Sequence, residues 1–123
     1  MKIHFWHSWI FPEPWPAGAL KLPSYQAHRG YHVSPLIENT LAAFQAAKKQ
    51  GIKMCECDVQ LSRDGVPVVF HDPSLKRLFS SNEMVVDLTS KELFKKAQVP
   101  TLESLLLDEN SPELWNLEIN PKK

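Results

Sequence analysis

The sequence predicts one α/β domain in which helices cover a mainly parallel sheet. From residue 24 onward, short apolar runs alternate with segments of helical periodicity, which is the pattern of consecutive β and α units. The chain has 123 residues, of which 43% are apolar and 23% charged, a composition typical of a globular domain. Fourteen basic and fourteen acidic residues balance, so we expect no nucleic-acid partner.

Composition divides the chain into an N-terminal extension, residues 1–22, and the domain, residues 23–123. The extension carries several large aromatic residues that we expect to pack on the domain. Its apolar run is interrupted by histidines and followed by prolines, so it resembles a signal peptide only faintly. Nowhere does an apolar run reach the roughly 20 residues needed to span a bilayer. The sequence therefore predicts no transmembrane segment and favours a cytoplasmic protein.

The first half of the domain contains two predicted strands with a helix between them. Residues 24–28 are the first strand. Asn39 or Thr40 can cap a helix over about residues 40–50, which Gly51 is well placed to end. A second strand follows over residues 53–61.

The next connection predicts a hairpin. A strand over residues 66–70 follows the second strand after only four residues, which is too short for a parallel crossover. If Asp64 and Gly65 are the two turn residues, Asp58 lies opposite His71. A bulge in the turn would shift this register by one residue.

The second half of the domain is predicted as two helices and a strand. Thr89 and Glu92 have the spacing of a capping box, which begins a helix extending through Ala97. Thr101 begins another helix that ends near Leu107. Residues 113–119 then alternate as a strand, with Glu118 on its polar side.

The stretch Cys55-Glu56-Cys57-Asp58 places thiols and carboxylates on opposite faces of one strand, because successive side chains alternate. We expect the cysteines to be reduced and packed against helices. The two acids on one face repel each other, so a hard divalent cation is a natural partner, and Glu118 has the parity to join them. The alternative is that these acids are exposed and paired with lysines.

Two of the five histidines stand in a chemical context. His28 precedes Arg29 and Gly30, a combination suited to an anionic substrate, because arginine binds phosphate through several donors and glycine allows close approach. His71 lies near the acids if the hairpin forms. Two such histidines can act as general base and general acid. The remaining histidines are predicted to be surface or packing residues.

Three segments together resemble the glycerophosphodiester phosphodiesterase family: AHRGYHVSPLIENTLAAF, CECDVQLSRDGVPVVFHD and LWNLEI. The resemblance covers about residues 25–119 and implies a (β/α)8 TIM-type barrel that hydrolyses glycerophosphodiesters to an alcohol and glycerol 3-phosphate with a divalent cation, Mg or Ca. It implies that attack comes from water or from the substrate's own glycerol hydroxyl. It also assigns roles by position: metal ligands Glu56, Asp58 and Glu118, acid and base His28 and His71, phosphate contact Arg29, and supporting residues Glu38, which would order the site, and Asn39, which would cap the helix.

The sequence departs from the family pattern in two respects. Where the family commonly has a lysine two residues after the third acid, this chain has Asn120. The chain also ends after about three barrel strands, whereas a barrel of typical size takes about 250 residues. We therefore expect a partial domain with an open sheet that could self-associate. Two hypotheses follow: a metal-dependent hydrolase acting on a small-molecule glycerophosphodiester, or a non-catalytic remnant that binds a divalent metal or a partner.

Overall fold

A computed structural model describes residues 22–120 of the chain. The expected N-terminal extension therefore lies outside the described residues except for Leu22. The described part contains the following elements in order: β1 (Ala27–His28), α1 (Leu41–Lys49), β2 (Met54–Leu61), β3 (Pro67–Val69), α2 (Lys76–Phe79), the 3-10 helix η1 (Val85–Asp87), α3 (Ser90–Ala97), α4 (Leu102–Leu106) and β4 (Leu114–Ile119). None of these helices is both long and apolar enough to cross a membrane.

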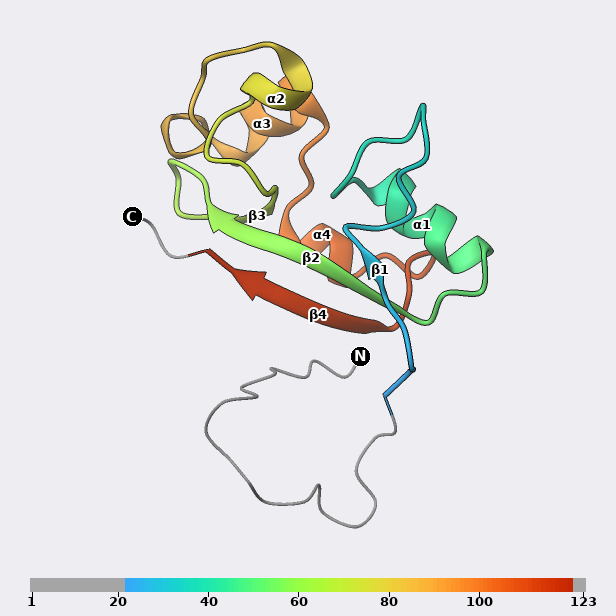
Figure 1. Ribbon diagram of the computed structural model, residues 1–123. Coiled ribbons are helices and arrows are strands. Elements are labelled where there is room, and N and C mark those ends of the chain that lie inside the picture. The colour runs from blue at the N-terminus through green and yellow to red at the C-terminus, as the bar shows by residue number, and fades with distance from the viewer. Residues whose placement is uncertain (1–21, 121–123) are drawn as a thin grey trace.

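The sheet is built around β2, its longest strand (Figure 1). β1 and β4 pair with β2 in parallel, on opposite sides of it, and β3 pairs with β2 antiparallel. This confirms the predicted alternation of parallel strands and helices with one inserted hairpin. The first strand is shorter than predicted, since only its last two residues pair with β2.

The hairpin between β2 and β3 differs by one residue from the register derived from a two-residue turn. Val59 pairs with Val69, and the Phe70 amide donates to the carbonyl of Asp58 at 3.0 Å. The loop closes with Ser62 opposite Val66, and Gly65 has a φ of +74°. Because this loop holds three residues and ends in a left-handed one, it shifts the partner strand by one position. Asp58 therefore lies opposite Phe70, and the predicted pairing with His71 was wrong.

The helix ends follow local capping chemistry. Thr40 caps α1, its hydroxyl accepting from the amide of Ala43. Thr89 and Glu92 form the predicted capping box at the start of α3, and Thr101 caps α4. The short helices α2 and η1 were not predicted, because neither has the length or the apolar periodicity that a sequence pattern needs.

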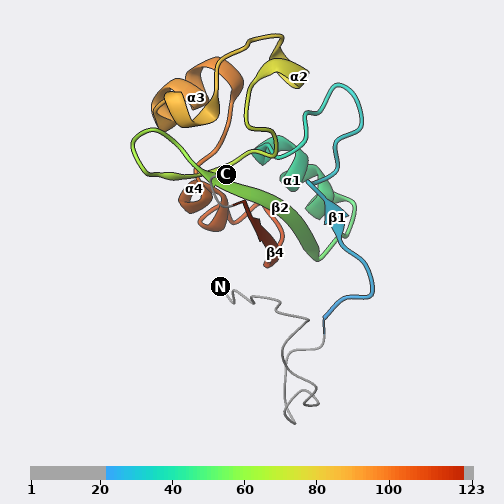
Figure 2. The ribbon, with the colours of Figure 1, turned by 60° about the vertical axis from the view of Figure 1, so that its left-hand side comes forward.

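Two clusters of buried side chains hold the elements together. In the first, Cys55 and Cys57 of β2 and Trp115 of β4 pack against α1 and α4, which cover the same face of the sheet (Figure 2). Phe44 of α1 meets Trp115 edge-on, with ring centroids 5.0 Å apart. The second cluster packs α3 and the segment from β3 to η1 around Val68 and Phe70.

Both cysteines are fully buried, and within residues 22–120 they form no disulfide. Burial raises the pKa of the Cys55 thiol to about 12, and it raises that of Cys57 well above its usual range. The thiols therefore act as small apolar side chains, as predicted. This leaves the opposite face of β2, with its acids, for polar chemistry.

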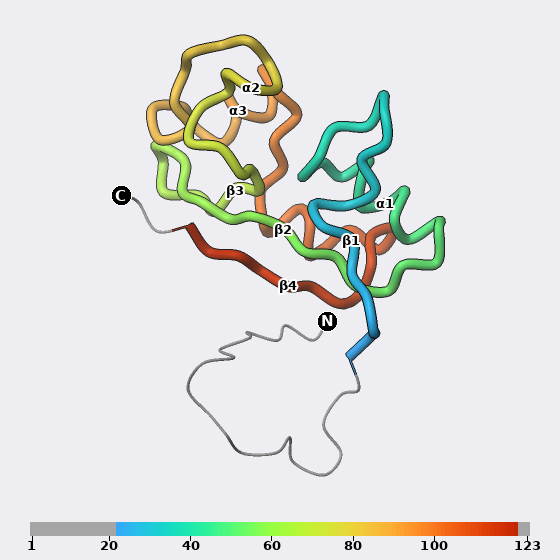
Figure 3. The backbone as a smooth tube through the Cα atoms, viewed as in Figure 1, coloured from blue at the N-terminus to red at the C-terminus, as the bar shows by residue number. Residues whose placement is uncertain are grey.

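Two connecting segments rise on the same side of the sheet. One follows β1 and leads to α1, and the other follows β3 and leads to α2 (Figure 3). Both carry residues singled out in the sequence: Arg29 lies in the first segment, directly after His28 of β1, and His71 lies in the second. Their proximity is what allows residues from distant parts of the chain to meet.

Candidate active site and metal centre

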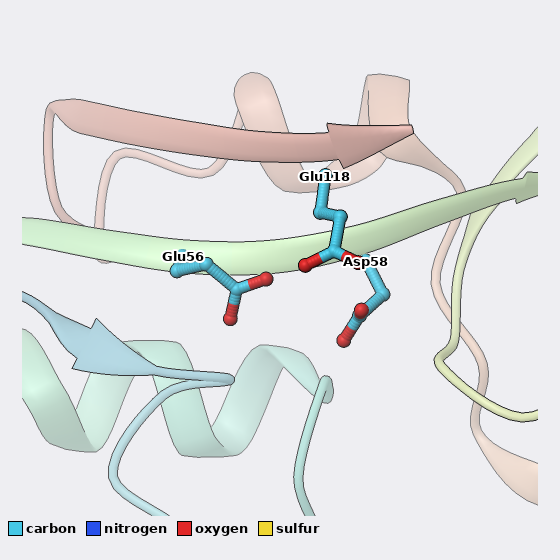
Figure 4. A group of neighbouring side chains, drawn as sticks. All are labelled: Glu56, Asp58 and Glu118. Carbon is cyan, nitrogen blue, oxygen red and sulfur yellow. The ribbon is translucent and has the colours of Figure 1, made fainter. Parts of the chain in front are cut away.

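Three carboxylates converge on the polar face of the sheet. Glu56 and Asp58 project from β2, and Glu118 projects toward them from β4, where it pairs in register with Asp58 (Figure 4). Each offers an oxygen, and these oxygens lie within 4.8 Å of one another. The regular alternation of side chains along β2 and β4 thus brings the three acids together, as predicted. Glu56 and Asp58 are buried and Glu118 is exposed.

Glu56 is almost fully enclosed. One carboxylate oxygen, Oε2, accepts from the amide of Arg29 at 3.2 Å and lies 3.8 Å from His28 Nε2. Burial, together with the charges of Asp58 and Glu118, raises the pKa of Glu56 to about 7. Without a compensating cation, this carboxyl group therefore keeps a proton much more readily near neutral pH than an ordinary glutamate does.

Asp58 is held by a residue to which the family resemblance assigned a different role. Asn39 donates from Nδ2 to Asp58 Oδ2 at 2.9 Å and accepts from the Asp58 amide at 3.4 Å. Asn39 has a φ of +57°, so it precedes the helix and leaves capping to Thr40. The expectation that Asn39 caps α1 was wrong, because its buried amide pairs with the acid.

The donor set fits a hard divalent cation. Within the described residues, Glu56 Oε1 and Asp58 Oδ1 are buried without a hydrogen-bond partner. Buried acceptors are normally satisfied, and two buried carboxylates beside a third call for positive charge. Carboxylate oxygens are the ligands that Mg²⁺ and Ca²⁺ prefer. A divalent cation bound here would give these two oxygens the partner that they lack among the described residues.

Arg29 lies between the acids and the loop that follows β1. Its Nη1 donates to Glu38 Oε1 at 3.0 Å, and its Nε is 3.0 Å from Asp58 Oδ2. The second contact is an ion pair without a well-directed hydrogen bond, because the N–H of Nε has no aligned acceptor among the described residues. The guanidinium has five N–H donors, and these two contacts leave others for a further anion.

Gly30 allows this loop to lie against α1. Its φ is +84°, and a Cβ at this position would come within 2.9 Å of Ala43. The neighbouring amide of Tyr31 donates to the carbonyl of Ala43 at 2.9 Å, which fixes the loop on the helix. The close approach therefore sets the position of Arg29.

The two candidate histidines are more exposed than the acids. The His28 side chain is 68% exposed and that of His71 is 41% exposed, so both can reach a ligand from solvent. His71 lies in the segment after β3, where its Nδ1 is 2.5 Å from Asp72 Oδ1. Gln60 of β2 holds the backbone of this segment by donating to the carbonyls of Phe70 and Asp72.

Arg77 is the site residue that sequence reasoning missed. It is the second residue of α2. Its Nε donates to Asp72 Oδ2 at 2.6 Å, and its Nη2 and Nη1 donate to Glu38 Oε1 at 2.5 Å and to Glu38 Oε2 at 3.1 Å. Glu38 in turn accepts from Arg29, so it does help to order the cluster. The only sequence signal was an arginine five residues after an acid, which is too common to be informative.

Comparisons with known proteins point to one family. A model of the glycerophosphoryl diester phosphodiesterase family matches residues 28–122. Glycerophosphodiester phosphodiesterase 1 of Homo sapiens is 40% identical over 70 residues, which are 56% of this chain and 20% of that protein. A glycerophosphodiester phosphodiesterase of Caldanaerobacter subterraneus is 42% identical over 69 residues, again 56% of this chain and 28% of the relative.

Solved structures extend the similarity to the fold. A glycerophosphodiester phosphodiesterase from Thermotoga maritima matches with a TM-score of 0.69 and 37% identity, over 78% of this chain and 43% of that one. An Oleispira antarctica phosphodiesterase in complex with the product sn-glycerol-3-phosphate matches with a TM-score of 0.65 and 36% identity, over 82% and 46% of the two chains.

The chain thus spans less than half the length of these relatives, and its open sheet corresponds to the N-terminal portion of their (β/α)8 barrel. β1, β2 and β4 are the parallel barrel strands, and β3 belongs to an inserted hairpin. With its motifs, sheet topology and family match in agreement, the chain belongs to the glycerophosphoryl diester phosphodiesterase family.

Proposed function

We propose that the described site takes part in metal-dependent hydrolysis of glycerophosphodiesters to an alcohol and glycerol 3-phosphate. The observation that carries this proposal is the convergence of Glu56, Asp58 and Glu118 with two buried oxygens that lack a partner. These three residues would hold a divalent cation, Mg²⁺ or Ca²⁺. Such an ion would supply Lewis-acid stabilisation of the phosphoryl group and favour deprotonation of the attacking hydroxyl.

The protein's own side chains would position the diester and move its protons. Arg29 has donors left for a phosphate oxygen and is held in place by Glu38 and Asp58. As a P–O bond forms to the incoming hydroxyl oxygen, one histidine takes the hydroxyl proton. As the P–O bond to the alcohol breaks, the other gives that alcohol its proton. His71 would act through Nε2, because its Nδ1 contacts Asp72.

Turnover and ion binding, measured separately on the 123-residue chain, test this proposal. Release of glycerol 3-phosphate from glycerophosphocholine is followed with Mg²⁺ or Ca²⁺ and again with a chelator, and thermal unfolding reports ion binding. We expect ion-dependent turnover and a rise in Tm, since an ion at a hundred times its Kd stabilises by about 2.7 kcal/mol. Glu56→Gln with Asp58→Asn should abolish both effects.

The control for this double variant is Glu113→Gln, which removes an exposed acid outside the cluster and should behave like the wild type. If the double variant retains ion-dependent turnover, the ligand assignment is wrong. Ion binding by a folded chain that shows no turnover would contradict hydrolase activity of this chain and support the alternative, a cation-binding protein without catalysis. The open sheet around β4 is the observation that favours this second candidate.

A further inference from the structure

We propose that Arg77 is a positioning residue that fixes the ring of His71 in one tautomer and one orientation by clamping Asp72 against Glu38. This inference rests on the proposed function for its catalytic meaning. Its structural basis is a continuous series of contacts that begins at His71 and ends at the carboxylate cluster. The series runs through these residues: His71, Asp72, Arg77, Glu38, Arg29 and Asp58.

The first step is the state of Asp72. Hydrogen bonds from Arg77 hold the pKa of Asp72 below its usual value, so the side chain is ionised at neutral pH. An ionised carboxylate can only accept hydrogen bonds. The nitrogen that faces it, Nδ1 of His71, must therefore carry the proton. In the neutral ring, this leaves Nε2 with a free lone pair, the form that a general base requires.

The second step is the orientation of Asp72. Arg77 contacts both of its oxygens, with Nε at 2.6 Å from Oδ2 and Nη2 at 3.2 Å from Oδ1. This two-point contact fixes the carboxylate plane, because a guanidinium is planar and rigid. A single ammonium group could neutralise the charge but could not set the plane. If the Asp72 carboxylate rotated out of this plane, its Oδ1 would lose the contact with Nδ1 of His71.

The third step is the anchoring of Arg77 itself. α2 is short and none of its residues is fully buried, so the helix alone provides little rigidity. The same guanidinium also contacts Glu38, which belongs to the segment after β1 and is held by Arg29. Arg77 thus ties the segment that carries His71 to the segment that carries Arg29. The proposed proton-transfer group and the proposed phosphate contact are held in a fixed relation by this one side chain.

A test that does not depend on activity reads the ring nitrogens directly. The 123-residue chain is labelled with ¹⁵N-histidine, His71 is assigned with a His71→Gln variant, and the tautomer is read from proton–nitrogen correlations at pH 8. We expect His71 to be mainly protonated at Nδ1. In Arg77→Met, the ratio of the two tautomers should shift by roughly tenfold toward protonation at Nε2, as a charge-assisted contact is lost.

Two further variants make the result specific. Lys76→Met removes a cation from the neighbouring position of the same helix, where the side chain is exposed, and should leave the His71 signals unchanged. Arg77→Lys keeps the charge but not the fork, so it should give an intermediate shift. If Arg77→Met fails to fold, Glu38→Gln tests the same contact by weakening the other anchor of Arg77. Unchanged His71 signals in the folded variants, or an equal change in Lys76→Met, would overturn the proposal.

Turnover of glycerophosphocholine separates this inference from the proposed function. If the chain is active, Arg77→Met should lower kcat by about tenfold with little change in KM. Proton transfer through His71 loses its support, whereas Arg29 keeps its own contacts with Glu38 and Asp58 and so its position for phosphate. If the wild type shows no turnover while the ring signals respond as expected, the proposed function fails and the positioning role stands. A larger effect on KM than on kcat would contradict the positioning role.

Discussion

At the scale of one residue, Glu56 shows how burial changes the protonation of a carboxyl group. Its carboxylate has one oxygen bonded to the Arg29 amide and another without a donor in the described part of the chain. Burial and the nearby Asp58 raise its pKa to about 7 from an ordinary value of 4.5. The folded chain therefore holds the Glu56 proton more tightly than the unfolded chain does.

This difference predicts a pH dependence of stability. Because the folded-state pKa is raised, the contribution of Glu56 is fully present below about pH 4.5 and is lost as the pH rises through about 7. The Glu56→Gln variant lacks this titration. In the presence of a chelator, its free energy of unfolding should therefore increase relative to that of the wild type as the pH rises from about 4.5 through about 7. The gain should be on the order of 3 kcal/mol, since the pKa of Glu56 rises from 4.5 to about 7 and each pKa unit corresponds to about 1.4 kcal/mol. Urea unfolding at several pH values measures it.

Glu113→Gln provides the comparison, because this exposed acid lies outside the cluster. Its stability should run parallel to that of the wild type over the same range. A constant difference between Glu56→Gln and the wild type from pH 4.5 to 8 would show that Glu56 is not protonated in the folded chain. Added Mg²⁺ or Ca²⁺ should reduce the difference at high pH, since the ion replaces the proton.

At this scale, simple alternation along a strand was enough to separate the thiols from the acids. It placed Cys55 and Cys57 in the core and brought Glu118 to the acids of β2, because both strands are regular and in register. It could not predict the role of Asn39, whose left-handed backbone lets its amide reach Asp58 across 19 residues of sequence. Such a contact depends on loop geometry that no local pattern encodes.

At the scale of elements, two glycines with similar backbone angles serve different purposes. Gly30 and Gly65 have φ values of +84° and +74°, but a Cβ at Gly30 would strike Ala43, whereas one at Gly65 would meet nothing within 4 Å. Gly65 therefore satisfies only the backbone of a turn. Gly30 also allows the loop that carries Arg29 to lie directly against α1.

The pair gives a matched test of this close approach. Gly65→Ala should cost about 1 kcal/mol, the usual penalty for a side chain in the left-handed region. Gly30→Ala should cost about 1 to 3 kcal/mol more, because the backbone of the loop or of α1 must move. Denaturant unfolding of both variants measures the difference. Equal destabilisation by the two substitutions would mean that the loop after β1 adjusts freely to the added Cβ. If the substitution at Gly30 also moves Arg29, ion binding should weaken as well.

The hairpin illustrates why elements were easier to predict than their register. The short link between β2 and β3 required an antiparallel pair, and Asp64-Gly65 suggested a two-residue turn. A third loop residue changes the pairing by one position without changing either strand. The helices with clear caps, such as α3 with Thr89, were placed well, whereas α2 has no capping side chain and no buried residue by which to recognise it.

At the scale of the whole molecule, both edges of the central strand β2 are paired, but the sheet formed by the described residues is not closed. β1 and β3 together line one edge of β2, while β4 lines the other. Among residues 22–120, no further strand pairs with the outer edge of β4. Exposed strand edges are templates for association with other chains. The three carboxylates of the candidate site lie on strands β2 and β4 of this open sheet, so association at its edge would take place beside that site.

We therefore expect the chain to self-associate through β4, where Ile119 is 55% exposed beside the open edge. Sedimentation velocity over a wide range of concentrations should show a monomer converting reversibly to larger species. Ile119→Lys should shift this equilibrium toward the monomer, because a charged side chain on an edge strand opposes pairing. Leu107→Lys removes an even more exposed apolar side chain, 69% accessible, from the end of α4 and should have little effect. A wild type that stays monomeric throughout, or an equal response to both substitutions, would show that the β4 edge does not mediate association.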